Sequence, residues 1–319
     1  MSGVLRRTTI ALAALLGVGA LFAAPALAAV PAVVTGAFSS LTYQTAVLGG
    51  SVNPEGGVTV VYFQYGTTNR YGAQSGSAEV AAGTKAVPVA IPITGLAAGT
   101  IYHYRIVGTN SSGTALGADK TLTTPKIPLA LAITSAAPSP APFASPIQIV
   151  GTLSGTDNAN APVQLQENTF PYTGGFQNYG NPELTFTNGS FTFNVLGTAM
   201  NTQFRVVSGN VASGVVTVEM TIAVTLQGEA AGTHRHPKIH FSGTITPAEP
   251  GSRLAFERLV GNAWRVVGGA VASAKTSGST VPFSKTLSIS GGGEFRALAL
   301  PVEGAHIAGY SNAVVVHPR

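Results

Sequence analysis

The sequence predicts an all-β protein, in which three tandem β-sandwich domains follow a signal peptide. Three observations predict this fold class: apolar residues alternate with period 2, Gly and Asn turn signals are frequent, and two short motifs recur at intervals of 91 to 101 residues. That interval is the length of one sandwich, about 100 residues. Beyond residue 28 no segment has a 3.6-residue apolar period long enough for a helix.

The composition excludes several kinds of chemistry. The chain has no cysteine, which excludes disulfides, thiol catalysis and zinc–cysteine sites. Only 9% of the residues are charged, against roughly 25% in an average domain, and 45% are hydrophobic, which is enough for a folded core. The sequence contains no G-x-S-x-G elbow, no phosphate-binding Gly loop that opens a helix, and no D-x-D calcium spacing. We therefore expect a protein that is not an enzyme and has no cofactor.

Residues 1–28 have the three parts of a secretory signal peptide. Two arginines at 6–7 precede an uncharged apolar run at 10–22, and 26–28 form a small-x-small cleavage site. The run has 13 residues, whereas a bilayer span needs about 20. We expect cleavage before Ala29, no membrane span in the mature chain, and a secreted, extracellular protein that is free or associated with the cell wall. An uncleaved N-terminal anchor is the alternative.

Two motifs recur three times along the mature chain. The first is Gly, a hydroxyl residue and an aliphatic residue; the second is an aromatic residue, Arg and a further residue of aliphatic type. The Gly and the Arg are 55, 54 and 53 residues apart in the three copies. The copies contain Gly50 and Arg105, Gly151 and Arg205, and Gly243 and Arg296. This repeat predicts domains over 31–125, 126–221 and 222–319.

Alternation and turn signals place the individual strands. Alternating apolar residues predict strands around 58–62, 163–165, 191–195, 254–256 and 287–289. Turn residues punctuate the chain at 53–57, 110–113, 188–189, 261–262 and 291–293. Asn188-Gly189 predicts a two-residue hairpin. The joints are expected at 124–128 and within 215–226, broken near 220–221.

Three segments of the first unit, 46–54, 62–68 and 95–105, follow a known family pattern. Through these residues the unit resembles a bacterial fibronectin type III domain. It implies a tyrosine corner, in which the Tyr102 hydroxyl ties the chain back near Leu96. The tryptophan common in the early strands of animal members is absent, so Tyr62 or Tyr65 is expected to fill that volume.

The units at 126–221 and 222–319 resemble each other and the immunoglobulin-like domains of secreted actinobacterial proteins. Sandwiches of this kind serve as spacers, adhesion modules and carbohydrate-binding accessories, so the resemblance implies a fold and not one function. We expect a non-catalytic secreted or cell-surface binding and adhesion protein. Its partner is an extracellular protein or a polysaccharide. A carbohydrate-binding accessory module and a structural spacer of a surface assembly are the alternatives.

An aromatic segment at 170–181 is the candidate ligand-binding site. Tyr172, Phe176 and Tyr179 lie among Gly, Asn and Gln residues. Aromatic faces stack on sugar C–H groups while amides bond hydroxyls, so these residues are suited to a polysaccharide. The alternative is a long hairpin whose aromatic residues cap the sandwich core.

Histidines and charged residues offer weaker candidates. His234 and His236 would share one face of an extended strand and are candidate ligands for Zn²⁺ or Cu²⁺; the alternative is a solvated basic loop, with His240 on the outer face of the strand that follows. Glu167 and Glu183 would face one another across a hairpin, which is weak evidence for glycosidase chemistry. Residues 222–319 hold nine basic and five acidic residues, and no basic run is interleaved with aromatics, which excludes nucleic acid as the expected partner.

Overall fold

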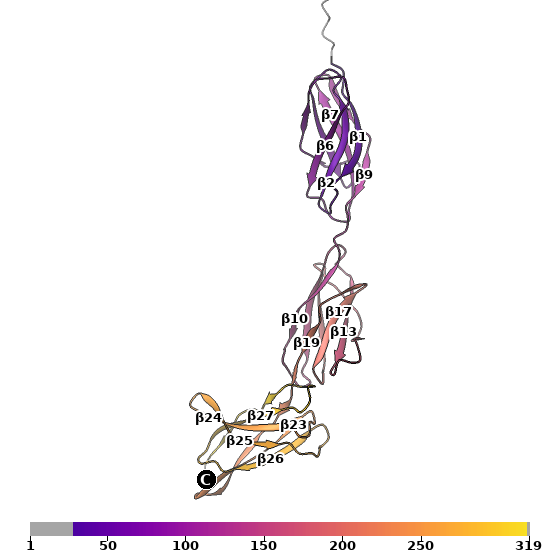
Figure 1. Ribbon diagram of the computed structural model, residues 1–319. Coiled ribbons are helices and arrows are strands. Elements are labelled where there is room, and N and C mark those ends of the chain that lie inside the picture. The colour runs from indigo at the N-terminus through magenta and orange to yellow at the C-terminus, as the bar shows by residue number, and fades with distance from the viewer. Residues whose placement is uncertain (1–27, 318–319) are drawn as a thin grey trace, which may run out of the picture. The chain divides into compact units, whose positions relative to one another are not determined.

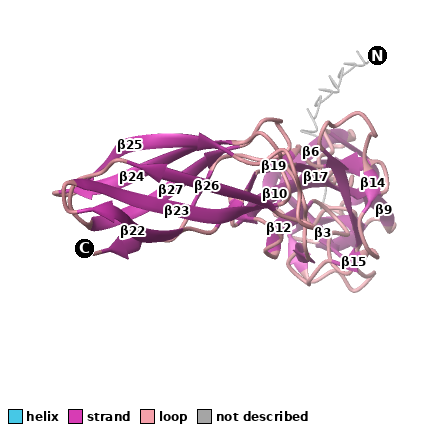
Figure 2. Ribbon diagram, turned by 90° about the horizontal axis from the view of Figure 1, so that it is seen from below, coloured by secondary structure: helices cyan, strands magenta, loops and turns pink. Residues whose placement is uncertain are grey.

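A computed structural model describes residues 28–317, which form strands and loops and no helix (Figures 1 and 2). The predicted signal peptide lies outside the described residues except for Ala28. The chain divides into two compact units, one that ends at Pro125 and one that begins at Lys126. The described part of the chain offers no helix with the length and apolar character that crossing a bilayer requires.

The first unit is a sandwich of two antiparallel sheets. One sheet has the order β1-β2-β6, and in the other β3 and β7 are central, with β4 and β5 on the far side of β3 and β8 and β9 on the far side of β7. The strands are β1 (Ala32–Ser39), β2 (Thr45–Asn53), β3 (Thr59–Gly66), β4 (Ala73–Gln74), β5 (Ala78–Val80), β6 (Val87–Thr94), β7 (Ile101–Asn110), β8 (Gly113–Leu116) and β9 (Lys120–Thr123).

The core of this sandwich corrects one expectation. On β3 the buried residues are Thr59, Val61 and Phe63, whereas Val60 is 43% exposed. The predicted alternation at 58–62 therefore had the wrong phase, because both faces of this strand carry apolar side chains. Phe63 is fully buried in the core, and Tyr65, one of the two residues expected to fill the tryptophan's volume, is half-buried and packs against that core.

The predicted tyrosine corner is confirmed. The Ala97 backbone N–H donates to the Tyr102 hydroxyl oxygen at 2.9 Å, and Leu96 is buried beside it. The edge strand β6 carries Pro88 and Pro92 on its exposed face. Proline has no N–H to offer, so these residues discourage pairing of this edge with another chain.

The strands between Ala130 and Thr221 form a second sandwich with the same sheet order. The sheets are β10-β12-β16 and β14/β15-β13-β17-β18/β19, and a short parallel pair joins β11 to β20. The strands are β10 (Ala130–Ala137), β11 (Ala141–Pro142), β12 (Ile147–Ser154), β13 (Pro162–Thr169), β14 (Gln177–Asn178), β15 (Glu183–Leu184), β16 (Ser190–Val195), β17 (Thr202–Ser208), β18 (Val211–Ala212), β19 (Val216–Val218) and β20 (Met220–Thr221).

The predicted tight turn at Asn188-Gly189 is present: Gly189 has φ +79° and donates its N–H to the Phe186 carbonyl, and the Phe186 N–H donates to the Ser190 carbonyl, each at 2.8 Å. The turn does not continue into a longer hairpin ladder. The strand before it, β15, pairs with β13 and not with β16. Register also places Glu183 opposite Val163 and Gln177 opposite Glu167, so the two glutamates do not face one another as expected.

The strands between Ala223 and Val316 form a third sandwich. In one sheet β23 is central, with β21 and β22 along one side and β26 along the other; the second has the order β25-β24-β27-β28/β29. Figure 2 shows β25 at the edge of this sheet. The strands are β21 (Ala223–Val224), β22 (Gln227–Thr233), β23 (His236–Thr246), β24 (Arg253–Val260), β25 (Ala263–Val271), β26 (Val281–Leu287), β27 (Gly293–Leu300), β28 (Gly309–Tyr310) and β29 (Val314–Val316).

Each sandwich packs two sheets around its own hydrophobic core, a fibronectin type III or immunoglobulin-like arrangement. When two short strands that pair with the same side of one neighbour are counted as one, every sandwich has a three-stranded and a four-stranded layer. The repeated Gly motif lies on the central strand of each three-stranded layer. A Cβ at Gly151 would collide with the Ala132 carbonyl and the Phe191 ring, and one at Gly243 with the Thr225 carbonyl and the Phe283 ring. The motif therefore lets the neighbouring strand and a core aromatic approach closely. The boundary near 221/222 stays a prediction.

Candidate binding surface

The repeated arginine lies on the outer face of each four-stranded layer. It follows a buried aromatic residue on β7, β17 or β27, and since side chains alternate, it points away from the core. Its Nε donates to the residue directly opposite on the neighbouring strand, at 2.7 to 2.9 Å. The pairs are Arg105 with Gln64, Arg205 with Gln166, and Arg296 with Glu257.

Each of these guanidinium groups also lies over an aromatic ring from a nearby strand or loop. The distances from Arg Cζ to the ring centroid are 4.6 Å for Tyr71 and 4.3 Å for Phe176. Cation–π contacts at this range contribute about 0.5–1 kcal/mol when exposed. The same arrangement has thus formed three times with aromatic residues that the repeat does not share.

The third sandwich extends the arrangement to two rings. Arg296 Cζ lies 4.4 Å from the ring of Trp264 on β25 and 4.1 Å from that of Tyr310 on β28. Trp264 is the only tryptophan of the chain, and Tyr310 is 53% exposed. Arg296 also forms an ion pair with Glu257, whose side chain is 11% exposed. We call Trp264, Arg296 and Tyr310 the aromatic–arginine ladder.

The first sandwich has a polar cluster beside its arginine. Asp119 accepts hydrogen bonds from the Tyr71 hydroxyl at 2.9 Å and from His103 Nδ1 at 2.7 Å. Burial alone would raise the pKa of Asp119, but these two bonds and the nearby charges of His103 and Arg105 outweigh it and lower that pKa. The bond to Asp119 holds the Tyr71 ring in place under Arg105.

The predicted sugar-stacking residues each have an intramolecular contact. One face of Phe176 lies against Arg205, and the Tyr179 hydroxyl accepts a hydrogen bond from the Leu196 N–H at 2.9 Å. Tyr172 packs edge-on against Phe170, with ring centroids 5.7 Å apart. A cavity of about 180 Å³ lies in this segment, but none of Tyr172, Phe176 and Tyr179 lines it. Sugar binding by these three residues stays a prediction.

Burial also perturbs a carboxyl group in this segment. Glu167, on β13, lines the same small cavity and is half-buried. Desolvation raises the pKa of Glu167.

The histidine pair lies at the β22–β23 hairpin. His234 is in the two-residue turn and His236 is the first residue of β23, so they are not alternate residues of one extended strand as expected. His240 lies between buried Ile239 and Phe241, with Nδ1 3.0 Å from the Thr286 hydroxyl. Among the described residues no group of three His, Asp or Glu side chains could hold a metal ion, and metal binding by His234 and His236 stays a prediction.

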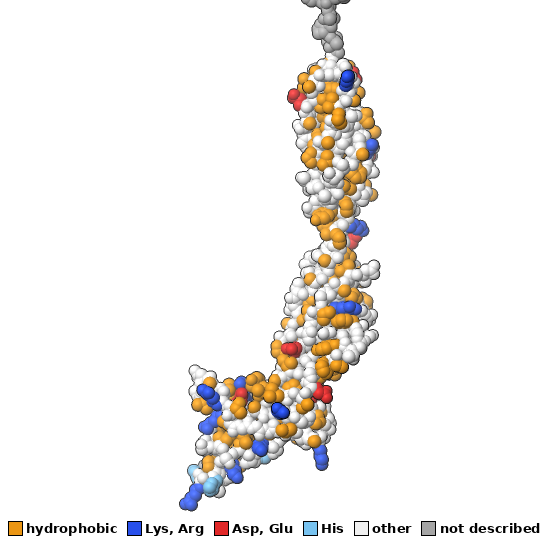
Figure 3. Space-filling view, in the orientation of Figure 1, with side chains coloured by type: hydrophobic (Ala, Val, Ile, Leu, Met, Phe, Trp, Pro, Cys, Tyr) orange, Lys and Arg blue, Asp and Glu red, His pale blue; other side chains and the backbone are white. Residues whose placement is uncertain are grey.

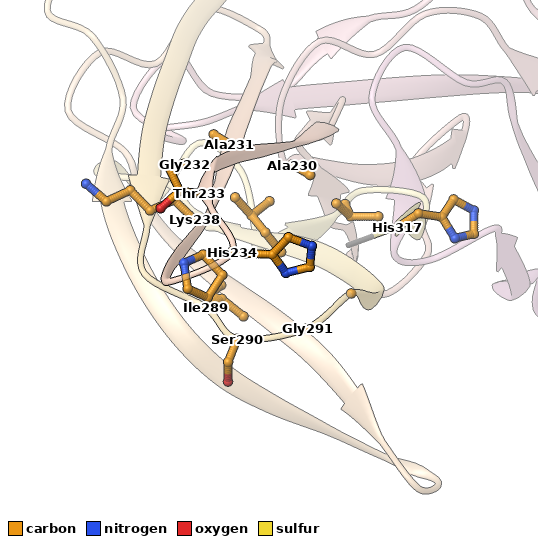
Figure 4. Close-up of a pocket in the computed structure, with 14 residues that line it drawn as sticks. Ala230, Ala231, Gly232, Thr233, His234, Lys238, Ile289, Ser290, Gly291 and His317 are labelled. Carbon is orange, nitrogen blue, oxygen red and sulfur yellow. The ribbon is translucent and has the colours of Figure 1, made fainter. Parts of the chain in front are cut away.

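A pocket of about 330 Å³ lies beside this hairpin (Figure 4). Its lining includes buried Ile239, Ile289 and Val316, with His234 and His317. Figure 4 shows that the Lys238 ammonium group points away from the other lining side chains. The ionisable side chains of the lining are His234, Lys238 and His317, with no carboxylate among them.

The sequence motif located the three arginines but not their aromatic partners. Tyr71 lies in a loop and Trp264 on an edge strand, at positions that differ among the repeats, so the spacing gave no signal for them. Trp264 was noticeable only as the sole tryptophan.

Scanning against protein-family models gives no match, and a search of curated protein sequences gives none either. Solved structures that match include the FN1–FN3 domains of chicken CNTN1, with a TM-score of 0.29, 11% identity, and coverage of 91% of this chain and 99% of that one. Domains A168–A170 of titin match with a TM-score of 0.37 and 15% identity, over 92% of this chain and 100% of that one. A tetra-tandem repeat from the extending region of a large adhesion protein matches with a TM-score of 0.32 and 16% identity, over 91% of this chain and 74% of that one. With TM-scores below 0.5, these proteins carry no function over to this chain.

Proposed function

We propose that the chain is a non-catalytic binding protein of the cell exterior, and that its third sandwich contacts a protein partner through the aromatic–arginine ladder. The ladder is the single observation that carries this proposal. Trp, Tyr and Arg are the residue types that dominate the binding energy of protein interfaces. Here one of each lies on the outer face of the same sheet, at Trp264, Arg296 and Tyr310.

The ladder is preorganised for binding. Arg296 is fixed by its ion pair with Glu257 and by the two flanking rings, so little side-chain freedom remains to be lost on association. Each side chain that is already immobile saves about 0.5–1.5 kcal/mol of ordering on binding. A flexible surface arginine would lack this advantage.

The surroundings of the ladder extend the contact surface. Trp264 is part of β25, which pairs only with β24 among the described strands. Val266 and Val271 on this strand are 65% and 64% exposed. Aromatic, aliphatic and arginine side chains are therefore contiguous along one sheet edge, as in the core of a protein interface.

The charge of this region supports an acidic partner surface. Residues 222–319 hold nine basic and five acidic residues, whereas 126–221 hold two and four. On the face drawn in Figure 3, the Lys and Arg side chains of residues 222–317 are spread out and do not form one cluster. Spread charges of this kind steer association and contribute specificity more than affinity.

A structural spacer is the second candidate function. Residues 199–222 and 304–307 are joined by several hydrogen bonds, so the second and third sandwiches form one compact unit. In both cases we propose that residues 1–28 direct export and that the mature chain is extracellular.

The test is retention of the purified mature chain on cells and cell fractions of its source organism. We expect binding to whole cells that protease treatment of the cells abolishes, and at least a tenfold loss of binding in the Trp264→Ala/Tyr310→Ala variant. Tyr43→Ala is the matched control, because Tyr43 is 44% exposed in the first unit. Retention on purified wall polysaccharide that both variants keep would overturn the proposal, and no retention anywhere would favour the spacer.

A further inference from the structure

The segment between β27 and β28 joins the third sandwich to the second. Asn201 is 6% exposed; its backbone N–H donates to the Ala305 carbonyl at 2.7 Å and its side-chain Nδ2 to the Gly304 carbonyl at 2.9 Å. The Ile307 N–H donates to the Met220 carbonyl at 2.8 Å. A Cβ at Gly304 would lie 3.2 Å from the Phe170 ring, so the segment packs tightly there. These contacts form a buried joint.

His306 lies inside this joint and is 7% exposed. Its Nδ1 is 2.5 Å from Glu249 Oε1, within the third sandwich. Its Nε2 is 2.6 Å from the carbonyl oxygen of Ala199, in the second. A carboxylate and a carbonyl are both acceptors, so the imidazole has to donate on both sides to satisfy both contacts.

Only the protonated ring has two N–H donors. A neutral imidazole carries one, and the charge-assisted bond to the Glu249 carboxylate is the stronger of the two, so Nδ1 keeps the proton. In the neutral ring, the lone pair of Nε2 would then point at a lone pair of the Ala199 carbonyl oxygen, and the two would repel each other. Loss of one proton therefore removes the bond between the sandwiches and leaves the bond within the third sandwich intact.

The charges around His306 favour the protonated ring. Glu249 is 13% exposed, and its Oε2 has no hydrogen-bond partner among the described residues, so His306 is the neighbour that balances its charge. The Phe143 ring lies 6.0 Å away and carries no charge. Glu219 and Glu303, on the adjoining segments, are both exposed. Burial lowers the pKa of His306, but the bonds to Glu249 and Ala199 and the charge of Glu249 outweigh it and raise that pKa above the usual 6.5.

We propose that His306 makes the joint between the second and third sandwiches sensitive to pH. In acid the imidazolium bridges Glu249 and Ala199 and holds the two sandwiches in one orientation. As the pH rises through the raised pKa of His306, the ring loses its proton, the contact with Ala199 becomes repulsive, and the sandwiches sample a wider range of orientations. The sign follows from linkage: a raised histidine pKa contributes stability that is lost as the pH rises through it.

Single-molecule energy transfer on the mature full chain tests this proposal. The chain has no cysteine, so Gln148→Cys on β12 and Lys285→Cys on β26, both exposed, accept the two dyes without competition. We expect a single narrow transfer-efficiency peak at about pH 5.5 and a broader, shifted distribution at about pH 8.5, on either side of the histidine range.

Two variants and a control complete the test. His306→Gln should abolish the pH dependence, and Glu249→Gln should move the midpoint of the transition to lower pH. His240→Gln is the control, because this half-buried histidine forms its hydrogen bonds with Thr286 and Ser284 on β26, away from the joint, and it should behave as wild type. If His306→Gln fails to fold, the test rests on whether Glu249→Gln moves the midpoint of the pH transition to lower pH. A distribution that is the same at both pH values, a pH dependence that survives His306→Gln, or an unmoved Glu249→Gln midpoint would overturn the proposal.

Discussion

Replacing Arg296 with methionine should unfold the third sandwich much more readily. Arg296 Nε bonds Glu257 at 2.7 Å, and the two side chains are 25% and 11% exposed. Removing one partner of a fully buried ion pair lowers the free energy of unfolding by about 3–5 kcal/mol. Because a quarter of the Arg296 side chain is exposed and solvent screens the pair, we expect a loss of about 2 kcal/mol here. Loss of two cation–π contacts adds about 0.5–1 kcal/mol each. The expected decrease in the free energy of unfolding is therefore about 3 kcal/mol.

Urea unfolding followed by tryptophan fluorescence measures this decrease. Trp264 is the only tryptophan and belongs to the third sandwich, so its fluorescence reports the unfolding of that sandwich. The matched control is Arg205→Met, which removes a bond to neutral Gln166 in the second sandwich and should shift the Trp264 transition much less. A change below about 1 kcal/mol for Arg296→Met would refute the view that Glu257 depends on this arginine for its charge balance.

Three further predictions concern the corner, the joint and a buried carboxyl group. Tyr102→Phe removes the bond to the Ala97 N–H and should lower the free energy of unfolding of the first unit by about 1 kcal/mol in chemical denaturation; no change would contradict the tyrosine corner. Gly304→Val places side-chain atoms against Phe170, and should broaden the energy-transfer distribution between the second and third sandwiches even at low pH; Gly174→Val, where no atom lies within 4 Å, is the control. Burial raises the pKa of Glu167 in the folded state, so the folded protein loses stability as the pH rises through that pKa and the carboxyl group becomes charged. Glu167→Gln removes this charge, and it should therefore stabilise the second sandwich at neutral pH and have little effect near pH 4. Thermal unfolding at the two pH values checks this.

The repeat in the sequence predicted the layers because it encodes close contacts. Gly151 and Gly243 are required where a neighbouring strand and a core ring approach the central strand, and Arg205 and Arg296 follow the aromatic residue that fills the core from the facing sheet. Such residues cannot be exchanged without a collision or a cavity, so they recur at fixed spacing. The phase of β3 could not be predicted, because valines and aromatic residues occupy both of its faces.

The candidate site was less predictable than the fold, because its residues come from separate strands. Trp264 and Tyr310 meet only through Arg296, and the two rings are 46 positions apart along the chain. The aromatic segment at 170–181 attracted attention because its rings are close in sequence, yet Phe170 packs toward Gly304 and Phe176 toward Arg205. His306 gave no signal at all, since its two acceptors, Glu249 and the Ala199 carbonyl, are distant in sequence.

Hydrogen exchange of the full chain, measured with and without a protein extract of the host cell surface, tests the proposed binding surface most directly. Binding through the aromatic–arginine ladder predicts slower amide exchange in 263–271, 293–300 and 309–310, and unchanged exchange in 170–181. Slower exchange confined to 170–181, or none in the three strands of the ladder when the partner is bound, would contradict it.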